Sequence, residues 1–542
     1  MPLALLLLVA VGLAVVLRQL HRRLTRISIS DLPGPQPESF LTGNLRQYLQ
    51  SQAGEIDFEW QETYGDLVRF KGPLGEDRIL VFDPKALQYI FRTGGYNFIK
   101  PKERRDLSLL ISGPGIVWAD GPDHRRHRKI MTPAFSTKEA KALVPLFLHF
   151  SSKLSHKWKD IISASNEQAV VFDTLSWLSR ATLDAIGAAA FDYQFERLDG
   201  KANELGDAYS SFCLHAFGRL SEGDIVKQAL TQLIPRPIRM LMAKCRPNRR
   251  MEVLRVAATV GSKVAKVLIE EKSEAILEGK KSRDIMSLLI RANYSEDDRT
   301  RLSEEEMISQ MRTILVAGGE STATSLTWFL LEMAKHPEMQ TKLREEIRQK
   351  RREIETRGDS EFTANDMEAM PYLVAVTKET LRFHPVSYTT VREAARDDVL
   401  PLSKPIFTAS GKTITEVPIP KGLKIFTSIN GYNRHKDVFG ADSHVYDPER
   451  WLTPGRIEKC ASVGVFDGSL LSFAGGVRSC IGWRFALLEL QSFFVELIDK
   501  FEFSLTPEAL QVRREACMVM SPTIEGQTDK GSQLPLLVKI AP

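Results

Sequence analysis

The alternation of apolar and polar positions changes along the chain. Between residues 60 and 100, strand-like stretches such as LVRF and RILVF precede the helix-like PKALQYIF. From 136 to 380, apolar residues recur three and four positions apart, which predicts mainly helices. Short strand-like pieces return from 386 to 450, and residues 518–540 predict a hairpin. The pattern therefore predicts a mainly α protein with minor β structure.

The clearest predicted helix lies between Ser303 and Pro337. Ser303 and Glu306 have the spacing of a capping box, and Pro337 ends a helix of about thirty residues. In its middle stand Gly318 and Gly319, each of which costs on the order of 1 kcal/mol relative to alanine. Such a costly pair needs a reason, either in packing or in function.

Three polar residues, Glu320, Ser321 and Thr322, follow the glycine pair directly. Two interpretations are open at this point. The first is a packing notch with a solvent-facing acid. The second is a widened helix turn that makes room for a small ligand, with a proton relay beside it.

Composition narrows the class of protein. The chain has 542 residues, 43% hydrophobic and 26% charged, which is enough for a large core. Its net charge of +5 comes from basic residues interleaved with acidic ones, so we expect no nucleic-acid partner. The five cysteines show no C-x-x-C spacing, which argues against a disulfide framework or a zinc site and favours a reducing compartment.

The N-terminus predicts a membrane anchor. Residues 2–17 are uncharged and apolar, and the basic RQLHRRLTR follows them. A cleaved signal peptide is the alternative, but it calls for positive charge before the apolar run and a small-residue cleavage site after it. We predict a transmembrane signal anchor at 1–20, a basic and proline-rich linker at 21–40, and one catalytic domain at 41–542. Positive charge after the anchor predicts that this domain faces the cytosol.

The stretch FAGGVRSCIG, residues 473–482, carries a cysteine in a loop rich in glycine. The apolar run after it has helical spacing, so Cys480 is expected at a loop-to-helix junction. A helix N-terminus with free backbone N–H groups stabilises a thiolate. Cys480 is therefore a metal ligand or a nucleophile, and this stretch alone leaves both open.

Four motifs together resemble the cytochrome P-450 superfamily of haem-thiolate monooxygenases. They are Phe473-x-x-Gly476-x-Arg478-x-Cys480-x-Gly482, AGGEST at 317–322, KETLRFHP at 378–385 and DPERW at 447–451. The resemblance implies the cytochrome P-450 fold, a single large haem domain, with haem (iron protoporphyrin IX) as the cofactor. It also implies that Cys480 is the axial ligand of the iron and that Phe473 shields its sulfur.

The resemblance implies four residues that bind the haem propionates: His124 and Arg128 in GPDHRRHRK, Arg392 in TVREAARD, and Arg478. His124 stands where many members have tryptophan, but its ring can still donate a hydrogen bond. Arginine suits this role because its planar fork binds carboxylates bidentately. Without a haem, each of these residues would be interpreted as surface charge.

Two further sets of residues are carried over from the family. Glu379, Arg382 and Arg450 are expected to form a buried structural network, since buried ions persist only when paired. Glu320, Ser321 and Thr322 are expected to deliver protons. The family's oxygen-side threonine aligns with Ser321, and Thr322 beside it could share the role.

The function that follows is a monooxygenase that inserts one oxygen atom from O2 into a C–H bond of a lipophilic substrate of terpenoid, sterol or fatty-acyl type, with secondary metabolism as one setting. Electrons are expected from a separate NADPH–cytochrome reductase. The alternatives are a haem-thiolate isomerase or dehydratase and a non-enzymatic haem protein. The basic cluster RRHRK, 125–129, is either a docking surface for the reductase or a solvated helix face. The expected location is the endoplasmic reticulum membrane.

Overall fold

The computed structural model describes residues 27–209, 218, 220–235, 237–239, 249–279, 282–297, 299–457 and 462–542. Most of these residues lie in helices, as the sequence pattern predicts. The helices are α2 Leu45–Gln50, α3 Glu55–Tyr64, α4 Pro84–Gln88, α5 Lys102–Ser112, α6 Gly121–Met131, α7 Thr137–Ala142, α8 Val144–Ala164, α9 Thr174–Phe191, α10 Glu204–Tyr209, α12 Glu222–Thr231, α14 Arg249–Leu277, α15 Ile285–Tyr294, α16 Glu304–Lys335, α17 Pro337–Thr356, α18 Ala364–Glu368, α19 Pro371–Phe383, α20 Ile429–Asn433, α21 Lys436–Phe439 and α22 Trp483–Lys500.

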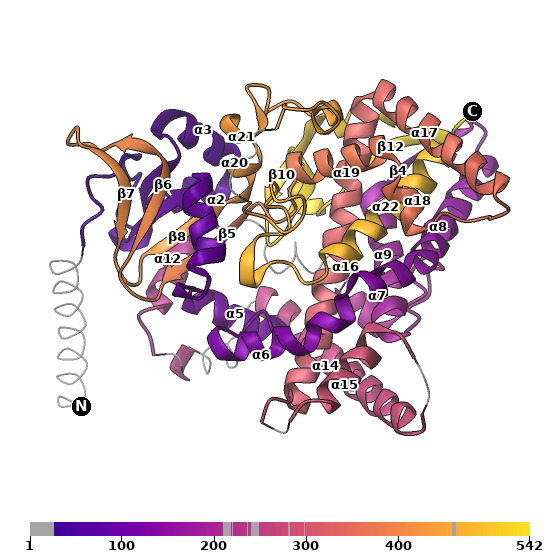
Figure 1. Ribbon diagram of the computed structural model, residues 1–542, viewed down its shortest axis with the longest axis horizontal. Helices are drawn as coiled ribbons and strands as arrows, with labels where there is room; N and C mark the ends of the chain where they lie inside the picture. Colours follow the sequence, from indigo (N-terminus) through magenta and orange to yellow (C-terminus); the bar gives the residue numbers. More distant parts are fainter. Residues whose placement is uncertain are drawn as a thin grey trace.

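Helix α16 runs through the middle of the molecule (Figure 1). The predicted capping box is present: the Ser303 hydroxyl accepts from the Glu306 backbone N–H, and the Glu306 carboxylate accepts from the Ser303 N–H. The helix has 32 residues, and most of its central and C-terminal side chains are buried in the main hydrophobic core. Helices α9 and α22 pack against it, so α16 positions whatever chemistry its central turn carries.

The strands form a mixed sheet and smaller pairings. The largest sheet has the order β1 (Leu67–Lys71), β2 (Asp77–Val81), β8 (Lys424–Ser428), β5 (Thr389–Ala394) and β3 (Phe98–Ile99). Strands β2 and β8 are parallel, whereas the other pairs are antiparallel. Most of this sheet lies with α2 and α3 at the end of the molecule opposite α8, α17 and α22 (Figure 1). Strands β6 (Asp398–Phe407) and β7 (Thr413–Ile419) form a separate hairpin.

The hairpin predicted at 518–540 is wrong in its pairing. Strand β11 (Met520–Ile524) pairs with the preceding β10 (Val512–Ala516), so the hairpin lies earlier in the chain. Strand β12 (Pro535–Ile540) instead joins β4 (Ala169–Asp173) and β9 (Phe501–Leu505) in a three-stranded sheet. The buried side chains Leu536 and Val538 explain this choice, because pairing there places them in the main core.

The predicted membrane topology is also corrected. From Ile27 onward, no helix in the described ranges is both long enough and apolar enough to span a membrane. The predicted anchor, residues 1–20, lies outside the described residues. The prediction of a single-pass protein of the endoplasmic reticulum membrane is therefore wrong for the part of the chain that the structure describes.

Candidate functional site

The cysteine loop is folded tightly between two other segments. The Cys480 backbone N–H donates to the Phe473 carbonyl at 2.9 Å, which closes the loop. Gly476 has a φ of +63°, and a Cβ there would lie 1.8 Å from the carbonyl oxygen of Phe91. Glycine is therefore required at 476 because the backbone of the 89–93 turn passes directly against it. Helix α22 begins just after the loop, as predicted.

The thiol of Cys480 has unusual surroundings. The side chain is exposed although many protein atoms surround it, so its sulfur is open to a ligand. Burial raises the pKa of the Cys480 thiol, while a hydrogen bond from the Gly482 backbone N–H and the nearby Arg128 guanidinium lower it. Without a further positive charge the thiol stays protonated, and a metal ion at this sulfur would favour the thiolate.

Cationic side chains gather beside the cysteine loop around one carboxylate. Arg128 donates to the Ser479 carbonyl at 2.5 Å, and Arg478 pairs with Asp120 and donates to the Gly95 carbonyl. Lys100 donates to the carbonyls of Ile116, Val117 and Ala119 at 3.0, 2.6 and 2.7 Å. Arg392 on β5 donates to the carbonyl of its neighbour Val391 at 3.1 Å.

These cations destabilise one another. Burial, followed by the charges of Arg478 and Arg104, lowers the pKa of Arg392 to about 10. Burial lowers the pKa of Lys100 to about 7; Asp120 opposes this, and Arg392, Arg478 and Arg105 add to it. Buried charges are tolerated only when paired, and among the described residues Asp120 is the carboxylate that forms an ion pair with this cluster, so its positive charge exceeds its negative charge. The two carboxylates of a haem would supply the missing negative charge.

His124 is buried on α6 and is held neutral. Its Nδ1 forms a hydrogen bond with the Tyr96 hydroxyl at 2.9 Å. Burial, with the charges of Lys100, Arg478 and Arg128, lowers the pKa of His124 to about 3. The neutral ring has one N–H donor, and when Nδ1 accepts from Tyr96 that donor is Nε2. The structure thus brings His124, Arg128, Arg392 and Arg478 to the same charged region.

The central turn of α16 remains regular α-helix, so the widened turn, one of the two interpretations left open by the sequence, is not seen. A Cβ at Gly318 would lie 2.7 Å from Ile186 of α9, so the glycine allows the two helices to pack closely. The Ser321 hydroxyl donates to the Ala317 carbonyl at 2.6 Å, and that of Thr322 to the Gly318 carbonyl at 3.1 Å. Ala317 is exposed although its helix is largely buried, so this face also borders open space.

Glu379, Arg382 and Arg450 form a buried network. Arg382 holds Glu379 bidentately at 2.8 and 2.7 Å and donates to the carbonyls of Asn433, Ser443 and Val445. The Arg450 Nε lies 3.7 Å from Glu379, and its Nη1 donates to Asp442 at 2.8 Å. All three side chains are almost fully buried. This arrangement ties α19 to the 433–451 segment.

Four residues beside these groups were not predicted from the sequence. Tyr96, Lys100 and Asp120 complete the charged region, and Glu489 is fully buried on α22 near Thr322. Only Asp120 carried a local signal, because an aspartate before Gly-Pro is a typical helix N-cap, and its carboxylate does accept from the Gly121 N–H.

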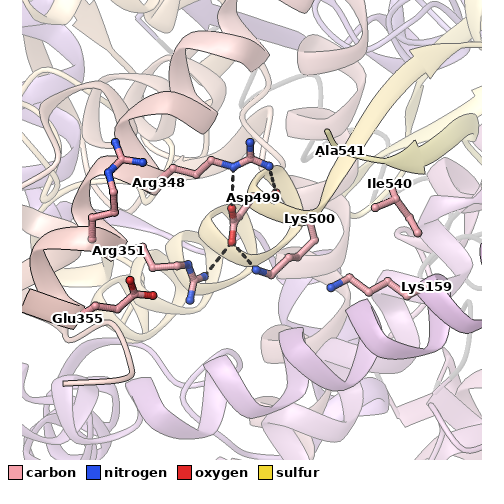
Figure 2. A pocket seen from close by; sticks show the side chains of 9 residues that line it. Lys159, Arg348, Arg351, Glu355, Asp499, Lys500, Ile540 and Ala541 are labelled. Carbon is pink, nitrogen blue, oxygen red and sulfur yellow. Dashed lines mark hydrogen bonds and ion pairs between the residues drawn. The ribbon is translucent and has the colours of Figure 1, made fainter. Parts of the chain in front are cut away.

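A separate hollow of about 420 Å³ lies between α8, α17, the end of α22 and β12. Figure 2 shows that Asp499 is surrounded there by Arg348, Arg351 and Lys500, at 3.2, 3.1 and 2.7 Å. This hollow lies at the end of α22 that is farther from the cysteine loop, roughly 27 Å along the helix. Its charged lining does not suit a lipophilic substrate, and the site described above is the better candidate.

Comparisons with known proteins point to one family. The family model for cytochrome P-450 matches residues 33–528. Cytochrome P-450 monooxygenase 205 of Postia placenta is 35% identical, over 94% of this chain and 93% of its own. Cytochrome P-450 monooxygenase claP of Ampulloclitocybe clavipes is 33% identical, over 96% of this chain and 94% of its own.

Proposed function

This chain belongs to the cytochrome P-450 superfamily and is a haem-binding monooxygenase, and from that premise we propose that it inserts one oxygen atom of O2 into a C–H bond of a lipophilic substrate. The observation that carries the proposal is the exposed Cys480 thiol beside an unbalanced group of cations. A thiolate ligand and partners for two carboxylates are what a haem of this class requires.

When bound, haem supplies the iron at which O2 is reduced with two electrons and two protons, one oxygen atom entering the substrate and the other leaving as water. Cys480 would hold the haem iron through its thiolate. The Gly482 N–H hydrogen bond limits the basicity of its sulfur. Arg128, Arg392, Arg478 and the Nε2 of His124 are assigned to the haem carboxylates, and Phe473, whose carbonyl holds the Cys480 N–H, to the shielding of the sulfur.

We assign proton delivery to the central turn of α16. The Glu320 side chain is half-buried, so it can exchange protons with water. Ser321 is also half-buried, and its hydroxyl, hydrogen-bonded to Ala317, can present a proton toward the open face beside that residue. Thr322 is buried, so its hydroxyl supports the turn more than it reaches this face.

We propose a separate NADPH–cytochrome reductase as the electron donor. The cluster at 125–129 offers less free charge than its sequence suggests, because Arg126 pairs with Glu306 at 2.5 Å and Lys129 with Glu296 at 2.8 Å. Arg125 is exposed and stacks over the Tyr96 ring at 4.4 Å. Most of this cluster is thus a paired helix face, and Arg125 is its best candidate for a contact with an acidic partner.

The proposed substrates are terpenoid, sterol or fatty-acyl compounds. The named relatives are fungal monooxygenases, and a role in secondary metabolism fits them. The test begins with a carbon-monoxide difference spectrum of the reduced protein, which should show a thiolate-ligated haem. Oxidation of a lipophilic library should then require both NADPH and O2. Turnover without O2 would favour an isomerase, and a normal spectrum with no turnover of any compound would favour a non-enzymatic haem protein.

Alanine at Ser321 and Thr322 together should uncouple NADPH consumption from product formation. General acid catalysis of this kind is typically worth about 10²–10⁴-fold, so product per NADPH should fall steeply while peroxide rises. Haem content and substrate binding should stay unchanged. We expect Ser321→Ala alone to uncouple more than Thr322→Ala, because Ser321 is the less buried hydroxyl. Unchanged coupling in the double variant would refute the relay.

A further inference from the structure

Glu489 is a buried acid that the proposed function leaves unused. It lies on α22, nine residues after Cys480, and its exposed fraction is 0%. Neither carboxyl oxygen makes a hydrogen bond of ordinary geometry. The polar group that interacts with it is the hydroxyl of Thr322 on α16. A buried carboxyl with so little polar support is costly, which calls for a functional explanation.

This acid is neutral at physiological pH. Burial raises the pKa of Glu489 to about 8, and only the contact with Thr322 opposes the rise. Charged groups on helices that pack near α22, such as Lys153 on α8 and Glu320 and Glu332 on α16, do not contribute to this shift. The protonated carboxyl has one O–H donor.

Thr322 is the polar side chain that interacts with Glu489, and it has the chemistry to accept a hydrogen bond from the neutral carboxyl. Its side chain is 3% exposed, and its hydroxyl proton is already donated to the Gly318 carbonyl at 3.1 Å. The oxygen of the same hydroxyl therefore has lone pairs left to accept. Glu489 thus reaches the 317–322 turn from the helix that begins at the cysteine loop.

We propose that Glu489 is a positioning residue whose neutral carboxyl holds the 317–322 turn of α16 in register with α22 through Thr322. It would fix the distance between the proton-delivering hydroxyls and the cysteine loop, which lie on these two elements. The inference rests on the proposed role of the 317–322 turn. A merely structural acid would stabilise the fold without linking the state of its proton to that turn.

The first test follows thermal unfolding of the haem-loaded protein from pH 5 to 8.5. Between pH 4.5 and 8 the folded protein binds the Glu489 proton and the unfolded chain does not, so the contribution of this group to stability falls as pH rises, by about tenfold in the folding equilibrium per pH unit. Glu489→Gln removes this titration. The melting temperature of the variant, relative to that of the wild type, should therefore increase as pH rises. Glu496→Gln, on the same helix, is the matched control and should run parallel to the wild type.

The second test asks whether Thr322 transmits the effect. Each of the single changes Glu489→Leu and Thr322→Val removes the same contact between the two side chains. The melting shift of the double variant should therefore be smaller than the sum of the two single shifts. Product per NADPH should fall in the wild type as pH passes about 8, and this fall should vanish in Glu489→Gln.

Additive melting shifts, or a coupling profile identical in wild type and Glu489→Gln, would overturn the proposal. The same holds if Glu489→Gln tracks the wild type from pH 5 to 8.5. The melting measurements do not depend on monooxygenase turnover, so failure of the proposed function would be seen separately, in the carbon-monoxide spectrum and the O2 dependence.

Discussion

Serine in place of Cys480 is expected to abolish the thiolate-ligated haem spectrum completely. A serine hydroxyl stays protonated at neutral pH and is a poor ligand for haem iron, whereas a cysteine thiolate is a strong one. Backbone contacts fix the position of residue 480 in the loop, since its N–H donates to the Phe473 carbonyl and Gly476 fits against the Phe91 backbone. The loop itself should therefore keep its shape in the variant.

The measurement is the carbon-monoxide difference spectrum, together with haem content per protein. Cys517→Ser is the control, because Cys517 is the other free cysteine in the described part of the chain and lies between β10 and β11. It should keep the wild-type spectrum. A normal thiolate spectrum in Cys480→Ser would show that the ligand assignment is wrong.

Alanine at Arg382 is expected to give misfolded protein that lacks haem. The substitution leaves Glu379 charged and fully buried, with its two arginine hydrogen bonds lost. Breaking a buried pair in this way costs about 3–5 kcal/mol, which is a large part of a typical stability of about 5–15 kcal/mol. The readouts are soluble yield, haem content and chemical unfolding.

A matched control exists on α14. Glu252 and Arg255 have the same Glu-x-x-Arg spacing and form an ion pair, but both side chains are exposed. Arg255→Ala should therefore change the yield and unfolding very little, since exposed pairs contribute little to stability. Soluble, haem-replete Arg382→Ala protein would contradict the structural role of the network.

The pairs Glu379–Arg382 and Glu252–Arg255 show what the sequence can and cannot predict. The Glu-x-x-Arg spacing predicts that two side chains share a helix face, and it does so at both places. It does not predict which face is buried. Arg348, another arginine in this pattern, pairs with Asp499 on α22 rather than with its local glutamate. In the sequence the buried pair is distinguished by His384-Pro385 directly after it, the rest of the KETLRFHP motif.

Local signals predicted local structure well. The cap at Ser303 and the helix after Cys480 depend on residues a few positions apart, and the structure contains both. The charged region depends on contacts between residues far apart in the chain, such as Arg478 with Asp120 and Arg128 with Ser479. Lys100 has no periodic signal, because its partners are three backbone carbonyls of a loop. The pairing of strand β12 was predicted wrongly because it also depends on a distant segment, strand β4.

The unbalanced cations near Cys480 have a consequence for how the protein is made. Lys100, Arg128, Arg392 and Arg478 face one acidic partner, Asp120, so a chain that folds before it acquires haem must hold mutual repulsion in its interior. A ligand that binds only the folded state stabilises it by mass action. A haem bound there would act as a counterion, so we expect the supply of haem in the host cell to affect how much of the newly made chain stays folded.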